Sequence, residues 1–308
     1  MTRLHHSYAG QLRLMQISAT QLYVFVEGKQ CDPYFFAQVC IATLDSDITY
    51  AVWTARQIPG NCGGKQGLLK FFTYLRKRRA LTTSLGGQRT TSIFFLDKDT
   101  DDIRRRRKRS PHVVYTKYYD VQNYVFENGN LAKGSAAAAS VDPRRLDGEL
   151  GDSSRWCRHV ATLWADWVAL CIRLLEDGIS GEANYRVLSR VQTRLCGPTD
   201  NGALNSMTCD MAHRAGIPVE ELRSRFRTSR DKVNTYLQRG RHHCIFKGKW
   251  FGAVLADDID RIMEGDPYDS HALSGRLPSA IATTLDFTEQ WVDDFKEPLL
   301  NVAAMLVC

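Results

Sequence analysis

Carboxylates stand at the points where two apolar stretches of the sequence end. Glu27 follows the stretch Tyr23–Val26, and Asp97 and Asp99 follow the stretch "SIFFL". Such β-branched and aromatic stretches favour central strands of a sheet, and α/β proteins place ligands at the carboxyl ends of these strands. Three carboxylates that converge there repel one another unless a cation lies between them. The sequence therefore predicts a site for Mg²⁺ or Mn²⁺, cations that prefer oxygen ligands.

The acids also have plainer interpretations. Glu27 could be a loop carboxylate, and the two strand-end aspartates could belong to a helix N-cap. Asp101, just beyond them, either extends the metal site or caps the basic segment that follows. Asp120 and Glu127 either supply a second metal position or are helix-start acids that interact favourably with the helix dipole.

Basic residues flank the acidic cluster and indicate a polyanionic substrate. The chain has 308 residues and a net charge of +7, and residues 70–79 and 104–109 concentrate positive charge in its N-terminal half. Basic patches are typical of nucleic-acid-binding proteins, although a basic run can also be a solvated face or a surface for an acidic partner. The predicted contacts with substrate phosphates are Lys29, Lys65, Arg105, Arg106, Arg107, Lys247 and Lys249.

Two further segments have the composition of ligand sites. The loop Pro59–Gly67 is rich in glycine, but Gln66 stands where a P-loop has Ser or Thr, so ATP binding is rejected and only contact with substrate phosphate is retained. His242 and His243 beside Cys244 suggest zinc. Without any CxxC motif, buried cysteines and surface histidines are the favoured interpretation, and the nine scattered cysteines fit reduced thiols in a cytoplasm.

Strands and helices alternate in the N-terminal part of the chain. This order implies right-handed crossovers and a mainly parallel sheet, hence an α/β fold. The expected elements are a helix from Asp32 to Leu44 with Asp32 as its N-cap, a strand from Ile48 to Ala55, a basic amphipathic helix after the glycine-rich loop, a third strand that ends in the DxD acids, and a strand from His112 to Asp120.

Composition divides the chain into three parts. Residues 1–128 are expected to form the catalytic α/β domain, the small and polar stretch 129–154 a linker or loop, and residues 155–308 a mostly helical domain. Within the last part, helical periodicity marks the segments Arg155–Gly178, Ile217–Arg239 and Leu285–Glu297. No apolar stretch reaches eighteen residues and the first twenty residues lack the apolar core of a secretion signal, so no membrane partner and a cytoplasmic location are expected.

The acidic motifs resemble those of the Toprim fold, a small parallel-sheet domain of topoisomerases, primases and OLD-family nucleases. In that family a strand ends in Glu-Gly, here Glu27-Gly28, and a later strand ends in Asp-x-Asp, here Asp97-Lys98-Asp99. The resemblance covers about residues 20–128, and it implies that Glu27 acts in acid–base chemistry or metal binding while the aspartates hold divalent metal.

The segments "VEGKQCDPYFF", "GNCGGKQGLLKFF", "FFLDKD" and "YYDVQNYVFE" narrow the resemblance to the stand-alone, OLD-like Toprim nucleases of bacterial phage defence. The "GK" element in "IFKGKWF" also fits. Among these nucleases the chain is most similar to the nuclease subunits of PARIS systems, which act with an ABC-type ATPase on transfer RNA. Because Gln122 stands where those relatives have an acid, the resemblance implies that Asp120 or Glu127 takes that role.

These observations predict a metal-dependent nuclease, an endoribonuclease that cleaves RNA such as transfer RNA and acts as a toxic effector in phage defence. The implied partners are the nucleic acid and an ABC-type ATPase, and a homodimer is compatible with the prediction. The alternative is a Toprim-like module that binds nucleic acid or a partner ATPase without cleaving anything. A pure binding module has no need of Glu27 and the DxD motif. Nucleotidyl transfer, as in primases, lacks a zinc ribbon or nucleotide fingerprint in the sequence.

Overall fold

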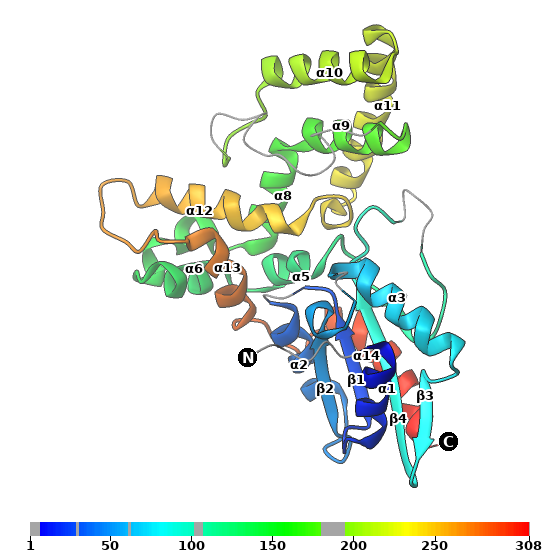
Figure 1. The fold of residues 1–308 in the computed structure, drawn as a ribbon. Coiled ribbons are helices and arrows are strands. Elements are labelled where there is room, and N and C mark those ends of the chain that lie inside the picture. The colour runs from blue at the N-terminus through cyan, green and yellow to red at the C-terminus, as the bar shows by residue number, and fades with distance from the viewer. Residues whose placement is uncertain (1–6, 29–30, 61–62, 102–106, 180–194, 308) are drawn as a thin grey trace, which may run out of the picture. The chain divides into compact units, whose positions relative to one another are not determined.

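The computed structural model describes residues 7–28, 31–60, 63–101, 107–179 and 195–307 (Figure 1). The chain divides into two compact units. Unit 1 contains Met1–Lys98, Lys108–Lys117 and Asp286–Cys308, and unit 2 contains Asp99–Arg107 and Tyr118–Leu285. Unit 1 is therefore built from three separate parts of the chain.

Unit 1 is built around a sheet, and the predicted α/β fold is confirmed. Strands β2 (Tyr50–Thr54), β1 (Leu22–Val26), β4 (Gln88–Leu96) and β5 (Val113–Tyr115) are neighbours in this order and run parallel. Strand β5 is much shorter than the predicted strand from His112 to Asp120. Apolar and aromatic residues make up β1 and the last four positions of β4, because both faces of a parallel sheet are covered by helices.

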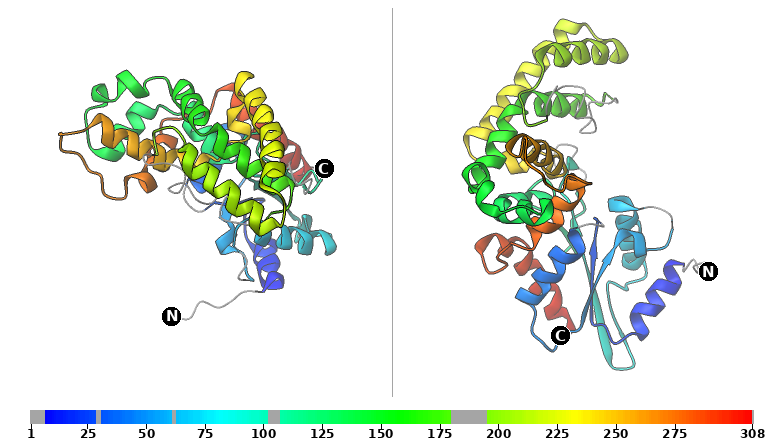
Figure 2. Two further views of the ribbon diagram at one scale, coloured as in Figure 1. Left: turned by 90° about the horizontal axis from the view of Figure 1, so that it is seen from above. Right: turned by 90° about the vertical axis from the view of Figure 1, so that its left-hand side faces the viewer.

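Helices cover both faces of the sheet in unit 1, as the right-hand view of Figure 2 shows. Side chains alternate between the faces along β4. Phe94 stacks on Phe25 at a ring distance of 4.7 Å and joins the core beneath α1 (Tyr8–Ile17) and α3 (Gly64–Lys77). Phe95 stacks on Phe36 of α2 (Asp32–Thr43) at 4.5 Å and also contacts Phe295 of α14 (Asp293–Ala303).

The connections place a topological switch point between β1 and β4. From β1 the chain passes through α2 to β2 on one side of β1, and then through α3 and a short antiparallel strand to β4 on the other side. The two helices lie on opposite faces because both crossovers are right-handed. Sheets of this kind open a crevice beyond the carboxyl ends of the two strands that flank the switch point.

An antiparallel strand, β3 (Thr82–Leu85), was not predicted. It pairs with the first residues of β4, and Gly86 and Gly87 form the tight turn between the two strands. Both glycines have positive φ, 59° and 82°, as a two-residue hairpin turn of type I′ requires. The Gly-Gly pair between two threonine-rich stretches is the signal that indicates this hairpin.

Unit 2 is helical, and the predicted linker at 129–154 is wrong. That stretch contains α6 (Leu131–Ala139) and α7 (Asp147–Leu150). Its small residues allow close packing against α13 (Leu273–Ala282), since a Cβ added to Gly129 or Gly134 would lie 2.5 Å or 2.7 Å from Ile281. A composition that resembles a linker thus serves the close approach of two helices.

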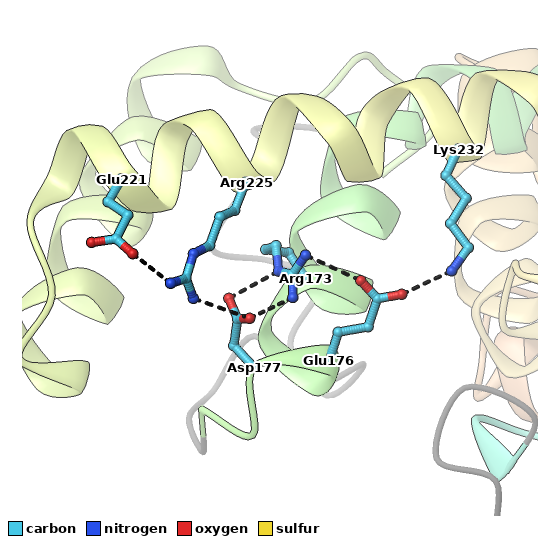
Figure 3. Close-up of polar contacts among 6 residues, drawn as sticks. All are labelled: Arg173, Glu176, Asp177, Glu221, Arg225 and Lys232. Carbon is cyan, nitrogen blue, oxygen red and sulfur yellow. Dashed lines mark hydrogen bonds and ion pairs between the residues drawn. The ribbon is translucent and has the colours of Figure 1, made fainter.

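The remaining helices of unit 2 surround a core that is rich in tryptophan and phenylalanine, including Trp164, Trp167 and Phe251. They are α5 (Val121–Asn128), α8 (Ser153–Leu163), α9 (Ala165–Glu176), α10 (Asn201–Ala215), α11 (Val219–Gln238) and α12 (Phe251–Ile262). Helices α9 and α11 are joined by ion pairs among Arg173, Glu176, Asp177, Glu221, Arg225 and Lys232 (Figure 3). The predicted helices at 155–178 and 217–239 agree with α8, α9 and α11.

The last predicted helix, Leu285–Glu297, begins later than expected and belongs to the other unit. A 3₁₀ turn at Gln290–Val292 precedes α14, and both lie in unit 1. Within the described part of the chain, no helix is both long and apolar enough to cross a membrane.

Candidate functional site

Glu27 and Asp97 lie at the carboxyl ends of neighbouring parallel strands. Val26 of β1 pairs in register with Phe95 of β4, so Glu27 is opposite Leu96 and Asp97 is one residue further along. Adjacent strands lie about 4.8 Å apart. Asp97 is buried, with 3% of its surface exposed, and Glu27 is half-buried. Both acids therefore lie at the carboxyl edge of the sheet beside the switch point, as the sequence predicts.

A second carboxylate holds the turn that follows Glu27. The prediction that Asp32 is the N-cap of α2 is wrong. Cys31 has that position, and Asp32 is the first helical residue. Its Oδ2 accepts a hydrogen bond from the backbone N–H of Gly28 at 2.6 Å. A Cβ at Gly28 would overlap the Asp32 carboxylate. The Glu-Gly sequence is thus explained by the buried aspartate that packs on the glycine and fixes the backbone beside Glu27.

The amino end of α3 lies next to Glu27. Gly64, the first residue of α3, has φ of +66°, and a Cβ added there would be 3.9 Å from Oε1 of Glu27. The N-cap is Gly63, so no side chain of the N-cap residue bonds to the first N–H groups of the helix. The N–H groups of the first helical turn, with half-buried Lys65, provide the kind of environment that binds phosphate.

Lys98, between the two aspartates of the DxD motif, is buried and has a structural role. Its backbone N–H donates to Oγ1 of Thr116 at 2.8 Å, and its ammonium donates to the carbonyl of Lys117 at 2.6 Å. These bonds hold the end of β4 to the segment after β5. They fix the backbone that carries Asp97.

Asp99 and Asp101 are half-buried residues of unit 2. Asp99 has φ of +47°, in the left-handed region that aspartate tolerates better than most residues. Its N–H donates to the carbonyl of Tyr119 at 2.8 Å. The three strand-end acids that were predicted to act together thus divide into Glu27 and Asp97 in unit 1 and Asp99 in unit 2.

Asp120 is almost completely buried and caps α5. Its Oδ1 accepts hydrogen bonds from the backbone N–H and the side-chain amide of Asn123, at 3.2 Å and 3.1 Å. The same amide donates to the carbonyl of Phe246 at 3.1 Å. Gly248 lies against this cap, since a Cβ there would overlap Oδ1 of Asp120 and lie 2.6 Å from the backbone nitrogen of Asn123.

Two predicted phosphate contacts, Lys247 and Lys249, flank Gly248 and act electrostatically on Asp120. Burial is the main cause that raises the pKa of Asp120, Lys249 and Lys247 oppose this rise while Asp99 adds to it, and the resulting pKa is about 6. Burial and the charge of Lys249 lower the pKa of Lys247. Lys247 is half-buried while Lys249 is exposed, so Lys249 is the better placed of the two for a substrate phosphate.

Glu127 is found in a group that the sequence did not predict. It is the second-last residue of α5, so the interpretation of Glu127 as a helix-start acid is wrong. Its Oε1 is hydrogen-bonded to Nε2 of His242. His242 is buried, which contradicts the expected surface histidine, and His243 is half-buried beside it. The adjacent histidines are the signal in the sequence, but their partner lies 115 residues away.

Of the other predicted basic contacts, only one lies within the described residues. Arg107 is described and exposed. Lys29, Arg105 and Arg106 lie outside the described residues.

Two comparisons with known proteins give no relative. No family model matches the chain, and no curated protein matches it. The resemblance to Toprim nucleases therefore stays a prediction that is based on the residues around Glu27 and Asp97.

Proposed function

We propose that the protein is a Mg²⁺- or Mn²⁺-dependent nuclease whose reaction takes place at the carboxyl edge of the sheet in unit 1. The observation that carries this proposal is the position of Glu27 and Asp97 on the two strands that flank the switch point. Carboxylates on both sides of the crevice are suited to a divalent cation and to a phosphate group that it binds.

The donor set fits a hard cation. Glu27 and Asp97, both in unit 1, supply oxygen ligands. A bound cation would supply a more acidic water and neutralise charge on the phosphate. Buried Asp97 is suited to a ligand role, whereas half-buried Glu27 can also accept the proton of the attacking water.

The amino end of α3 supports the choice of a phosphate ester as substrate. Its N–H groups and the positive end of the helix dipole favour an anion, and Gly64 lies beside Glu27. Lys65 adds a positive charge at the same helix start. These groups would orient a substrate phosphate beside the two carboxylates, and Gly64 allows its backbone to adopt the required left-handed conformation.

RNA is the proposed nucleic acid, with transfer RNA as the specific substrate that the family resemblance implies. The same resemblance carries the proposals of a toxic effector in phage defence, an ABC-type ATPase as partner and a cytoplasmic location. Exposed Arg107 and Lys249 are the described residues proposed to contact phosphates along the substrate. Such contacts depend on salt and select little for sequence.

The test is incubation of the full chain with total cellular RNA or plasmid DNA, with Mg²⁺, Mn²⁺ or a chelator. Glu27→Gln and Asp97→Asn should each reduce cleavage by about a hundredfold or more, because each removes a ligand or the general base. Asp47→Asn is the matched control, since this exposed acid precedes β2 at the other edge of the sheet. Full cleavage by folded Glu27→Gln would overturn the proposal. Tight binding without cleavage by the wild type would favour the binding module.

A further inference from the structure

Glu127, His242 and His243 bring three metal-binding groups together inside unit 2. One ligand atom of each residue lies within 4.8 Å of the ligand atoms of the other two. Glu127 comes from α5, and the histidines form the 3₁₀ turn His242–Cys244. The side chains of His242 and Glu127 are 3% and 7% exposed, so the group is largely shielded from water.

Neighbouring residues hold each histidine in place. His242 bonds to Glu127 through Nε2, whereas its Nδ1 is buried and has no hydrogen-bond partner in the described chain. The ring of His243 lies 3.9 Å from the ring of Tyr118, which stacks on Tyr124 at 4.0 Å. The carbonyl of His243 also accepts a hydrogen bond of 2.8 Å from the backbone of Tyr119.

We propose that Glu127, His242 and His243 form a binding site for a divalent transition-metal ion of the zinc class. Two imidazoles and one carboxylate are the donor set of many three-residue zinc sites, with a further position left for water or another ligand. This set differs from the all-oxygen edge of unit 1, which suits Mg²⁺. The inference does not rest on the proposed nuclease reaction, which is argued from Glu27 and Asp97 of unit 1.

The donor set is defined by geometry. Among the described residues, the ligand atoms that lie within 4.8 Å of one another belong to Glu127, His242 and His243, and Cys157 is not one of this group. The nitrogen and oxygen donors of the three residues therefore define the site.

The competing explanation is that the His242–Glu127 pair has a purely structural role. A substitution of His243 distinguishes this explanation from a metal site. The pair can hold the 3₁₀ turn to α5 without His243, whereas a metal site needs all three residues. His243→Gln removes one ligand and leaves the buried pair intact. Loss of metal binding in His243→Gln therefore reports the metal site and not the loss of the buried hydrogen bond between His242 and Glu127.

The experiment uses the full chain after treatment with a chelator and dialysis. Zn²⁺ is titrated in competition with a chromophoric chelator. The wild type should bind one Zn²⁺ in this site, and Glu127→Gln and His243→Gln should each weaken binding by about tenfold or more. His159→Gln, at an exposed position on α8, is the matched control and should bind as the wild type does.

Two further measurements make the result decisive. Co²⁺ in place of Zn²⁺ should give ligand-field absorption without a thiolate charge-transfer band, and His243→Gln should lose that absorption. Zn²⁺ should raise the melting temperature of the wild type and of Glu27→Gln equally, because only the folded state binds the ion. Equal Zn²⁺ affinity of wild type and His243→Gln, or a thiolate band with Co²⁺, would overturn the proposal.

Discussion

Each unit packs an aspartate against a glycine, but the two contacts are built in different ways. In unit 1, Asp32 lies four residues after Gly28 and accepts a hydrogen bond from its N–H. In unit 2, Asp120 and Gly248 come from distant parts of the sequence and are joined through Asn123. The first contact shapes one turn, whereas the second holds two segments together.

The two contacts also differ in what a change in each is expected to affect. Asp120 is more than 98% shielded from solvent, and its Oδ2 has no hydrogen-bond partner in the described chain. Burial of this carboxylate costs free energy when it is charged, which its raised pKa reflects. We therefore expect changes at the Asp120–Gly248 contact to affect stability most, and changes at the Asp32–Gly28 contact to affect activity as well.

The largest effect is expected for Gly248→Ala. The added Cβ meets a backbone nitrogen, that of Asn123, as well as the Asp120 carboxylate, so rotation of one side chain cannot relieve the overlap. The free energy of unfolding should fall by about 3 kcal/mol or more. Urea denaturation measures it. Gly275→Ala is the control, because an added Cβ there meets no atom of the described chain within 4 Å, and it should change stability little.

The next largest effect is a pH-dependent difference in stability between the wild type and Asp120→Asn. Asparagine at this position can still cap α5. The pKa of Asp120 is about 6 in the folded protein against an ordinary value of 3.8, so the folded state holds the proton more tightly. The wild type should therefore lose stability as pH rises from about 4 to about 6, on the order of 3 kcal/mol in total.

Asp120→Asn should not show this loss, so the stability of the variant relative to the wild type should increase over the same pH range. Urea denaturation of both proteins at a series of pH values provides the measurement. A difference that does not change with pH would show that the burial of Asp120 carries no such cost.

A smaller loss of stability, about 2 kcal/mol, is expected for Gly28→Ala. Here the three atoms nearest to the added Cβ all belong to the Asp32 carboxylate, which can rotate away if it gives up the hydrogen bond to residue 28. Cleavage should fall with stability because the turn carries Glu27. The double variant Gly28→Ala/Asp32→Ser should recover part of the stability, and strictly additive effects in this cycle would contradict direct contact.

The smallest effect is expected on the surface of unit 2, where Lys232 pairs with Glu176 at 2.8 Å (Figure 3). Both side chains are substantially exposed, so Lys232→Met should cost about 0.5 kcal/mol or less, and high salt should remove the difference. Asp177→Asn should cost more, because Asp177 is only 11% exposed and pairs with two arginines. Thermal unfolding at low and high salt tests both, and a larger loss for Lys232→Met would contradict the ranking.

The sequence predicts those parts of the protein whose signal is local. Strands β1 and β4 follow from apolar stretches, and the edge position of Glu27 and Asp97 follows from the acids that end them. Strand β3 was not predicted because it is short and polar. Helix α6 was not predicted because glycine and serine in its packed face resemble a linker. The role of Asp32 was not predicted because a carboxylate at a helix start can either cap the helix or accept a hydrogen bond from the preceding turn.

The Glu127–His242 pair could not be predicted from spacing, because only the folded chain brings α5 and the 3₁₀ turn together. The same holds for Gly248 and Asp120. Contacts of this kind depend on the path of the chain between them. No periodicity or motif in either segment specifies its partner.

The place of α14 in the chain has a consequence for synthesis on the ribosome. Phe295 of α14 covers Phe35, Phe36 and Phe95, yet the large part of unit 2, Tyr118–Leu285, is translated between β5 and α14. Until α14 emerges, one aromatic face of the nascent sheet lacks its cover and is exposed to chaperones and to aggregation. The strands that carry Glu27 and Asp97 are thus among the first elements to be made and among the last to be fully buried.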